Sequence, residues 1–212
     1  LALSVGGGEC LLVQLGMTGR LTLQASSDDG ARPHDHVRFG LDDGHRLVFN
    51  DVRRFGWLRV VAADGIDALL GGGLEPLGAD FDGSRLFRDT RGRRVAIKSL
   101  LMDQHVVLGV GNIYANEALF HAGVRPRRRA ARLTRRECAR IAEATRAVLE
   151  EAIASGGSTI SDYRDGHGRF GTYQRQHRVY DRDGEPCRVC RGPVKRCRIV
   201  GRSSFYCARC QR

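Results

Sequence analysis

Hydrophobic and polar positions alternate along the first sixty residues of the chain. The clearest run is 37–49, in which apolar residues recur at every second position on both sides of Asp43-Gly44. A two-residue period is typical of a β-strand with one buried face, and Asp-Gly is a common hairpin turn. The same pattern predicts strands at 10–15, 21–24 and 55–61. We therefore predict antiparallel β-structure for this first section.

A helical spacing of apolar residues replaces the alternation beyond the glycine-rich segment 71–76, which we interpret as a boundary. A short helix is predicted at 95–104. Asn112 is in the position of an N-cap for a second helix at 113–121. The segment 134–137, Thr-Arg-Arg-Glu, is a capping box that begins a longer helix. The second section is therefore expected to be helical.

Four cysteines near the C-terminus have the spacing of a metal site. Cys187, Cys190, Cys207 and Cys210 form two C-x2-C pairs that are separated by sixteen residues. Two such pairs typically bind one tetrahedral zinc ion, and four thiolates leave no open position for water. The alternative is a pair of disulfides. We predict one structural Zn²⁺.

Positive charge increases along the chain. The net charge is +11, distributed as −3 over residues 1–78, +5 over 79–163 and +9 over 164–212, and 33 of the 35 basic residues are arginine. Arginine forms two parallel hydrogen bonds with a phosphate, so the gradient indicates a surface for a polyphosphate such as nucleic acid. The alternative is an arginine-rich composition with solvated charges.

The chain has neither a membrane-spanning apolar run nor the pattern of a signal peptide. We therefore expect a cytoplasmic protein. Three further cysteines lie outside the paired set. Cys10 and Cys138 occur in apolar patterns and are expected to be buried thiols, and Cys197 lies between the two C-x2-C pairs without a predicted role.

Four motifs, in this order along the chain, together resemble one family. They are Leu-Gly-Met-Thr-Gly at 15–19, Asp-Val-Arg-Arg-Phe-Gly at 51–56, Leu-Gly-Val-Gly-Asn-Ile-Tyr-Ala-Asn-Glu at 108–117, and the four-cysteine finger at 184–210. The chain resembles the formamidopyrimidine-DNA glycosylases and their endonuclease VIII relatives over essentially all of its length.

The resemblance implies an α+β multidomain fold. A partial antiparallel β-sandwich is expected at 1–77, a helix–two-turn–helix module at 78–160, a loop or linker at 161–176 and a zinc finger at 177–212. Double-stranded damaged DNA would lie between the sandwich and the other two parts. The resemblance also implies a bacterial monomer that is associated with the nucleoid.

The family extrudes a damaged nucleotide from the duplex and fills the vacated stack with side chains. By resemblance the void-filling residues are Met17, Arg54 and Phe55; the alternative for Met17 and Phe55 is an ordinary core position. The residues expected to contact the DNA backbone are His34, Arg53, Arg93, Lys98 and Asn112. Arg202 matches the arginine that reaches the phosphates of the lesion nucleotide and acts in the second elimination step.

The implied activity is that of a bifunctional DNA glycosylase and AP lyase. Such an enzyme excises oxidised purines, 8-oxoguanine and formamidopyrimidines, and cleaves the abasic strand by β,δ-elimination through a Schiff base. The family's N-terminal proline, the glutamate after it and a later lysine have no counterparts here, since Leu1 aligns just beyond that lysine. We expect this chain to be an inactive N-terminally truncated fragment of the enzyme. The alternatives are an endonuclease VIII-like enzyme for oxidised pyrimidines and a non-catalytic damaged-DNA-binding protein.

Overall fold

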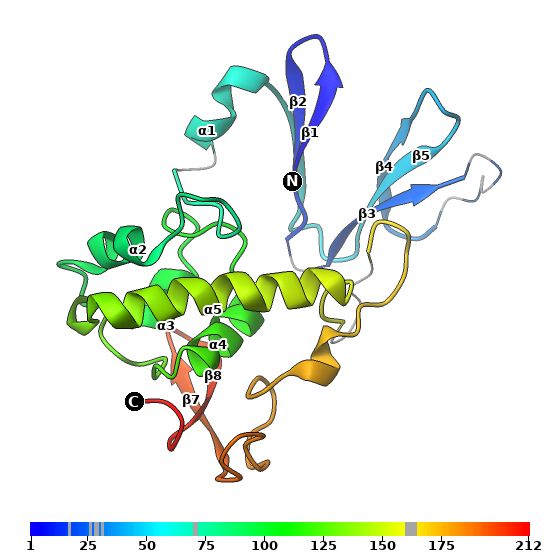
Figure 1. Ribbon diagram of the computed structural model, residues 1–212. Coiled ribbons are helices and arrows are strands. Elements are labelled where there is room, and N and C mark those ends of the chain that lie inside the picture. Colours follow the sequence, from blue (N-terminus) through cyan, green and yellow to red (C-terminus); the bar gives the residue numbers. More distant parts are fainter. Residues whose placement is uncertain (17, 26, 28–29, 31, 70–71, 160–164) are drawn as a thin grey trace. The chain divides into compact units, whose positions relative to one another are not determined.

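The chain forms two compact units. The computed structural model describes residues 1–212 except 17, 26, 28–29, 31, 70–71 and 160–164 (Figure 1). Unit 1 comprises Leu1–Asp67 and Ala152–Arg175, and unit 2 comprises Ala68–Glu151 and Gln176–Arg212. The segment that the sequence suggested as a linker, 161–176, thus belongs almost wholly to unit 1 where it is described.

Unit 1 contains two antiparallel three-stranded sheets, as the alternation predicted. One sheet has the order β1-β2-β6 and the other β3-β5-β4. Their strands are β1 (Ala2–Gly6), β2 (Glu9–Gln14), β3 (Gly19–Gln24), β4 (Asp35–Gly40), β5 (Arg46–Asp51) and β6 (Trp57–Ala62). The two sheets share one apolar cluster, in which Leu11 and Val13 of β2 contact Phe49 of β5. This face-to-face packing is that of a β-sandwich.

The boundaries of the predicted strands differ from the observed ones by one or two residues; the strand predicted at 21–24, for example, begins at Gly19. The strand predicted at 55–61 begins only at Trp57, because Arg54 adopts a positive φ of 55° and the chain turns there. The strand predicted at 10–15 ends at Gln14, before Gly16 with its φ of 64°. The predicted hairpin between β4 and β5 is confirmed, with Gly44 at φ 81° in the turn.

Unit 2 is built on helices. They are α2 (Gly83–Thr90), α3 (Ile97–Leu101), α4 (Asn112–His121) and α5 (Arg135–Ala154), with a 3-10 turn at Ala130–Arg132. The last three residues of α5 belong to unit 1. The short elements η1 (Ala63–Gly65), α1 (Ile66–Leu69) and η3 (Tyr173–Gln176) lie at or near the unit boundaries. The core of unit 2 is apolar and fully buried, with Leu101, Leu119 and Ile141 at its centre.

Two helix predictions needed correction and one is confirmed. The helix expected at 95–104 is only Ile97–Leu101. Gly111, not Asn112, is the N-cap of α4, so Asn112 is the first helical residue and makes no side-chain cap bond. The capping box before α5 is present: Glu137 N–H donates to Thr134 Oγ1 at 3.2 Å, and Thr134 N–H donates to Glu137 Oε2 at 2.8 Å.

The C-terminal segment of unit 2 is a β-hairpin of β7 (Val194–Ile199) and β8 (Arg202–Cys207). Val200 and Gly201, both with positive φ, form its two-residue turn, and Arg202 follows directly. The hairpin packs on α4 through a cluster that includes Phe120 and Phe205. Among the helices in the described part of the chain, none has the length and apolar character that crossing a bilayer requires.

Candidate nucleic-acid interface and metal centre

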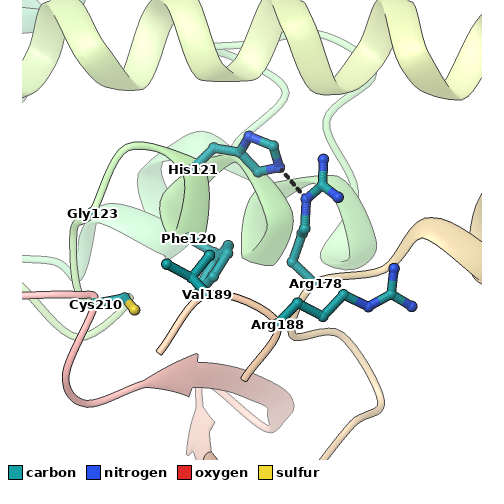
Figure 2. A pocket seen from close by; sticks show the side chains of 7 residues that line it. All are labelled: Phe120, His121, Gly123, Arg178, Arg188, Val189 and Cys210. Atoms are coloured by element: carbon teal, nitrogen blue, oxygen red, sulfur yellow. Dashed lines mark hydrogen bonds between the residues drawn. The ribbon is translucent and has the colours of Figure 1, made fainter. Parts of the chain in front are cut away.

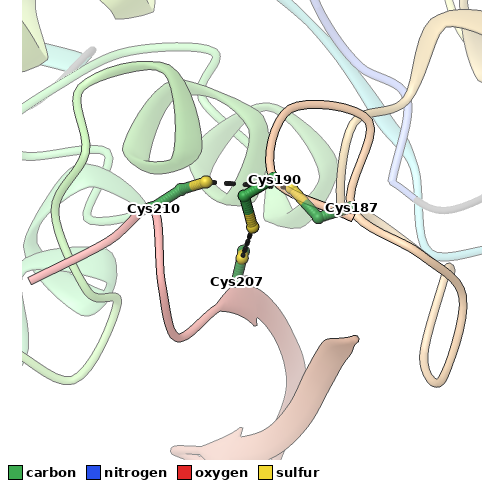
Figure 3. A group of neighbouring side chains, drawn as sticks. All are labelled: Cys187, Cys190, Cys207 and Cys210. Carbon is green, nitrogen blue, oxygen red and sulfur yellow. Dashed lines mark hydrogen bonds between the residues drawn. The ribbon is translucent and has the colours of Figure 1, made fainter. Parts of the chain in front are cut away.

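The four paired cysteines converge at one point. Their Sγ atoms all lie within 4.8 Å of one another, with 3.9 Å between Cys187 and Cys210 and 3.3 Å between Cys190 and Cys207 (Figure 3). A tetrahedral zinc ion with Zn–S bonds of about 2.3 Å places its sulfur atoms about 3.8 Å apart. The donor set therefore fits a structural Zn²⁺, and the disulfide alternative does not describe a cluster in which all four thiols meet. Cys10 and Cys138 are buried, as predicted.

The chemistry of this cluster also calls for a cation. Burial and the neighbouring thiols raise the pKa of Cys210, so ionisation there is unfavourable without a compensating positive charge. A divalent metal supplies that charge and binds the thiolate form. Metal binding and folding of the finger are therefore coupled.

Glu117 of α4 holds the segment that leads into the finger. It is fully buried, and its carboxylate accepts three consecutive backbone N–H groups, those of Arg178, Val179 and Tyr180, at 2.7, 3.0 and 2.8 Å. A buried carboxylate is tolerated only when it is paired or hydrogen-bonded in this way. Sequence reasoning did not assign Glu117 a role, although an acidic residue in a buried helix segment was an available signal.

Asn116 makes the second link between α4 and the finger. Its Oδ1 accepts the backbone N–H of Phe205 at 2.7 Å, and its Nδ2 donates to the carbonyl of Asn112 at 2.6 Å. One amide side chain thus connects strand β8 to the N-terminal end of α4. The Asn-Glu pair of the third motif is therefore an anchor for the metal-bound hairpin.

A hollow of about 530 Å³ lies at the other end of α4, beside the metal ligand Cys210 (Figure 2). There, Arg178 Nε donates to His121 Nε2 at 3.2 Å, and Arg178 also pairs with Glu151 at 4.0 Å. Desolvation and the charge of Arg178 lower the pKa of His121, which matches its role as acceptor. Because Arg178 binds both His121 and Glu151, we assign these side chains a structural role, which is to hold the finger against α4.

Lys98 of α3 is brought to the finger hairpin. Its side chain is 1% exposed, and its Nζ donates to the carbonyl of Ser203 at 2.8 Å and to Ser204 Oγ at 2.6 Å. Burial lowers the pKa of Lys98 to about 8, and the nearby positive charge of Arg202 acts in the same direction. From the sequence we expected Lys98 to contact the DNA backbone, and its two bonds to strand β8 were not foreseen.

Lys98 and Arg202 line the same small cavity of about 190 Å³. Its other lining residues are Ser99, Met102, Ile199 and Val200. Two cations at one cavity, with no carboxylate among its lining residues, favour an anionic ligand. Two residues that are 104 positions apart in the sequence are thus placed together.

The N-terminus of α4 has free donor capacity. The first backbone N–H groups of a helix have no intrahelical acceptors, and Gly111 provides no side-chain cap. Asn112 Oδ1, which is an acceptor and adds nothing to this donor capacity, is buried without a hydrogen-bond partner in the described part of the chain. A helix N-terminus of this kind is suited to a phosphate. Arg93, by contrast, pairs with Asp103 at 3.7 Å.

In unit 1 the first two motifs are joined through Asp51. This buried carboxylate accepts the Thr18 hydroxyl and the backbone N–H groups of Gly56 at 2.8 Å and Arg53 at 3.3 Å. Burial alone would raise the pKa of Asp51, but these hydrogen bonds outweigh it and lower the pKa. Sequence reasoning did not assign this organising role to Asp51.

The glycines of the first motif are required by close packing. A Cβ atom at Gly19 would lie 2.0 Å from the carbonyl oxygen of Leu15, and one at Gly16 would lie about 3.1 Å from the backbone at Phe55. The turn can therefore form, and approach the Arg53–Gly56 loop, only with glycine at these positions. Met17, predicted to fill the vacated stack, lies outside the described residues.

Phe55 and its neighbouring arginines extend from this loop. Phe55 is 58% exposed, which is unlike a core residue. The Arg53 guanidinium lies 4.7 Å from the centre of the Phe55 ring, a cation–π contact. Arg54 follows with a φ of 55°. The loop therefore presents an exposed aromatic ring in contact with the Arg53 guanidinium, and Arg54 beside them in the sequence is also exposed.

His34 lies in a hollow of about 700 Å³ within unit 1. Its carbonyl accepts the backbone N–H of Asp51 at 3.1 Å, and Leu23 N–H donates to Gly166 O at 2.8 Å at the same hollow. The polar or charged lining residues are Arg20, Thr22, Gln24, Arg32, His34, Asp35, Asn50 and His167. His34 and the loop after α5 thus share one polar hollow.

Family models match three stretches of the chain. The Formamidopyrimidine-DNA glycosylase N-terminal domain matches residues 1–58, the Formamidopyrimidine-DNA glycosylase H2TH domain matches 72–164, and the zinc finger found in FPG and IleRS matches 184–212. The third match and the four-thiol geometry together identify the cysteine cluster as a zinc finger.

Known proteins resemble the chain over most of its length. A formamidopyrimidine-DNA glycosylase of Thioalkalivibrio sulfidiphilus is 52% identical over 206 residues, which cover 95% of this chain and 75% of that protein. The MutM (Fpg) crystal structure from Thermus thermophilus superposes with a TM-score of 0.85 at 42% identity, covering 97% of this chain and 76% of that one. Lactococcus lactis Fpg in complex with N7-benzyl-Fapy-dG DNA gives a TM-score of 0.89 at 28% identity, covering 100% and 78%.

Proposed function

Because this chain belongs to the formamidopyrimidine-DNA glycosylase family, we propose that it acts in base-excision repair of double-stranded DNA. The proposed activity is that of the family, a bifunctional DNA glycosylase and AP lyase for oxidised purines, 8-oxoguanine and formamidopyrimidines. Residues 1–212 supply its DNA-binding parts, and none of them is assigned the role of nucleophile. The observation that carries the proposal is the convergence of Lys98 and Arg202 on one cavity, at a hairpin whose four cysteines are placed to bind zinc. Fold similarity alone would not specify a function.

Unit 2 binds the phosphates around the lesion. The Lys98–Arg202 cavity supplies two cations, and the N-terminus of α4 at Asn112 supplies backbone donors. Arg202 reaches the phosphates of the lesion nucleotide and assists the second elimination. Arg93 remains a candidate for a backbone contact, although its pairing with Asp103 must then be exchanged for a phosphate.

Unit 1 recognises the distorted duplex. An extruded base leaves a gap in the stack, and an exposed aromatic ring next to guanidinium groups fills such a gap. Phe55, Arg54 and Met17 are the proposed void-filling residues, and His34 and Arg53 the proposed backbone contacts. The stacking of Arg53 on Phe55 supports a share in void filling for Arg53 as well.

A binding assay with three duplexes tests the proposed function. One duplex contains 8-oxoguanine, the second an oxidised pyrimidine such as thymine glycol, and the third is undamaged. We expect tightest binding to the 8-oxoguanine duplex. A preference for thymine glycol would indicate the endonuclease VIII-like alternative, and equal binding to all three would contradict lesion recognition.

Borohydride trapping on the same duplexes tests the Schiff-base chemistry. The amines of this chain are the α-amino group of Leu1 and the side chains of Lys98 and Lys195, and none of them is assigned the role of nucleophile. We therefore expect a shifted complex without a covalent adduct for residues 1–212 by themselves. A covalent adduct would show that one of these three amines can attack the sugar.

Paired substitutions separate void filling from phosphate contacts. Arg54→Ala is expected to weaken binding of the lesion duplex more than that of undamaged DNA, because a void exists only after extrusion. Arg53→Ala measures the share of the arginine that stacks on Phe55. Arg59→Ala, on the exposed strand β6 of the same unit, is the matched control. Equal losses on both duplexes would make either loop arginine a phosphate contact.

A further inference from the structure

The loop between α4 and α5 carries a dense group of arginines that the site described above does not use. Residues 125–132, Arg-Pro-Arg-Arg-Arg-Ala-Ala-Arg, contain five arginines and no acidic residue. Like charges at this density repel one another and weaken a fold unless each has a partner. The partner of each guanidinium group therefore indicates whether that arginine stabilises the fold or is available to a ligand.

Two of these arginines have structural partners. Arg125 donates to the carbonyls of Gln211 at 3.0 Å and Ala208 at 3.1 Å, which ties the loop to the C-terminal end of the finger. Arg128 forms an ion pair with Glu137 at 3.2 Å. Both side chains serve the fold.

The other three project into solvent around a common hollow. Arg127, Arg129 and Arg132 are exposed, and together with Arg128 they line a hollow of about 600 Å³. Arg127 bonds to the carbonyl of Arg198 at 3.0 Å and to the side chain of Cys197. For Arg129 and Arg132 no side-chain hydrogen bond or ion pair occurs within the part of the chain that the structure describes. We call these four residues the arginine hollow.

The arginine hollow adjoins the two segments that carry Lys98 and Arg202, the cations of the proposed phosphate site. The backbone N–H groups of Ile97 and Lys98 at the start of α3 donate to the carbonyls of Arg128 and Pro126, at 2.8 and 3.3 Å. Arg127 bonds to β7 of the finger hairpin, whose turn leads to Arg202. All of these residues belong to unit 2. The segment that carries the hollow is thus hydrogen-bonded to both segments that form the Lys98–Arg202 cavity.

We propose that the arginine hollow is a second phosphate-binding site for duplex DNA, which holds the sugar-phosphate backbone away from the lesion. It rests on the proposed function, which supplies the DNA, and adds a contact without sequence or lesion preference. Guanidinium groups that face an open hollow lined by four arginines, of which Arg128 is paired with Glu137, match a phosphodiester in charge and hydrogen-bonding geometry. Such a site lets the protein hold undamaged DNA while it searches.

The test is the salt dependence of binding to undamaged duplex, measured with the full chain. The Arg129→Gln/Arg132→Gln variant removes two charges but keeps the backbone bonds of the loop. Each phosphate contact contributes about 0.9 to the slope of log K against log salt, so the slope should fall in magnitude by about 2. The single Arg132→Gln variant should show about half of that change, and zinc content and thermal unfolding verify the fold of both.

The control variant is Arg88→Gln/Arg209→Gln, which removes two exposed arginines of unit 2 outside the hollow. Its slope should stay within about 0.5 of the unmodified chain. An unchanged slope in the Arg129/Arg132 variant, or an equal change in the control, would overturn the proposal. The ratio of lesion to undamaged affinity is read separately: its absence in the unmodified chain would refute the proposed function, whereas the slope on undamaged duplex concerns the arginine hollow alone.

Discussion

At the scale of single residues, Lys98 shows how burial and function combine. Its ammonium group is almost fully desolvated, yet two oxygen acceptors from β8 hold it in place beside Arg202. Burial of this charge without a carboxylate opposes folding, and a bound phosphate would relieve the cost. The buried charge of Lys98 therefore lowers the free energy of unfolding at the position where we propose that the chain binds DNA.

The lowered pKa of Lys98 predicts a pH dependence of stability. The pKa is 10.5 in the unfolded chain and about 8 in the folded one, so between these values the unfolded state binds more protons. The free energy of unfolding should therefore rise with pH from 8 to 10.5, by on the order of 3 kcal/mol. Urea unfolding at pH 8 and pH 10 measures it.

The Lys98→Met variant should lack this rise, and Lys195→Met, which removes the only other lysine of the chain and is exposed, should retain it. The difference between the two variants removes the contribution of other titrating groups. Parallel pH profiles for both variants would contradict the assignment.

At the scale of elements, helix α4 organises unit 2 from both of its ends. Its N-terminus offers backbone donors at Asn112, and its middle holds the finger through Asn116 and Glu117. Phe120 near its end packs against the finger cluster. One ten-residue helix thus fixes the hairpin relative to the proposed phosphate site.

The Glu117→Gln substitution should destabilise unit 2. It removes the charge from a carboxylate that accepts three backbone N–H groups and places an amide donor against them. We expect a loss of about 2 kcal/mol in the free energy of unfolding, measured by urea denaturation. Glu143→Gln, on the exposed face of α5, should change it by less than about 0.5 kcal/mol. Equal effects would mean that Glu117 does not anchor the finger.

Removal of zinc should unfold the β7–β8 hairpin and abolish DNA binding, because without a metal the four clustered thiols cannot hold the two C-x2-C segments together. A chelator titration with a metal assay and a native gel measures both, and added zinc should restore binding. Cys197→Ser, which alters the one finger cysteine outside the cluster, should retain metal and binding. Tight binding by the metal-free chain would contradict the role of the finger.

At the scale of the whole molecule, charge separates the two units. Unit 2 has 25 basic and 13 acidic side chains, a net charge of +12, whereas unit 1 has 10 and 11, a net charge of −1. Affinity for the DNA backbone should therefore come from unit 2, and discrimination between damaged and undamaged DNA from unit 1.

Salt should consequently affect affinity and discrimination differently. With Lys98, Arg202, Arg129 and Arg132 as phosphate contacts, affinity should fall about 100-fold between 50 and 200 mM salt. The ratio of lesion to undamaged affinity should change by less than about threefold, because stacking and void filling are not ionic. Titrations of both duplexes at several salt concentrations measure the two quantities. A ratio that falls steeply with salt would contradict the assignment of affinity to unit 2 and of discrimination to unit 1.

The sequence by itself determined the strand alternation, the capping box, the zinc ligands and the family motifs, because each depends on local spacing. It did not determine that Asp51 ties two motifs together or that Glu117 holds the finger, since these contacts join positions 33 and 62 residues apart. Only the tertiary structure places Lys98 and Arg202 at one cavity, and Arg129 and Arg132 around an open hollow. Burial and partnering of a charge depend on distant segments of the chain, and no local pattern encodes them.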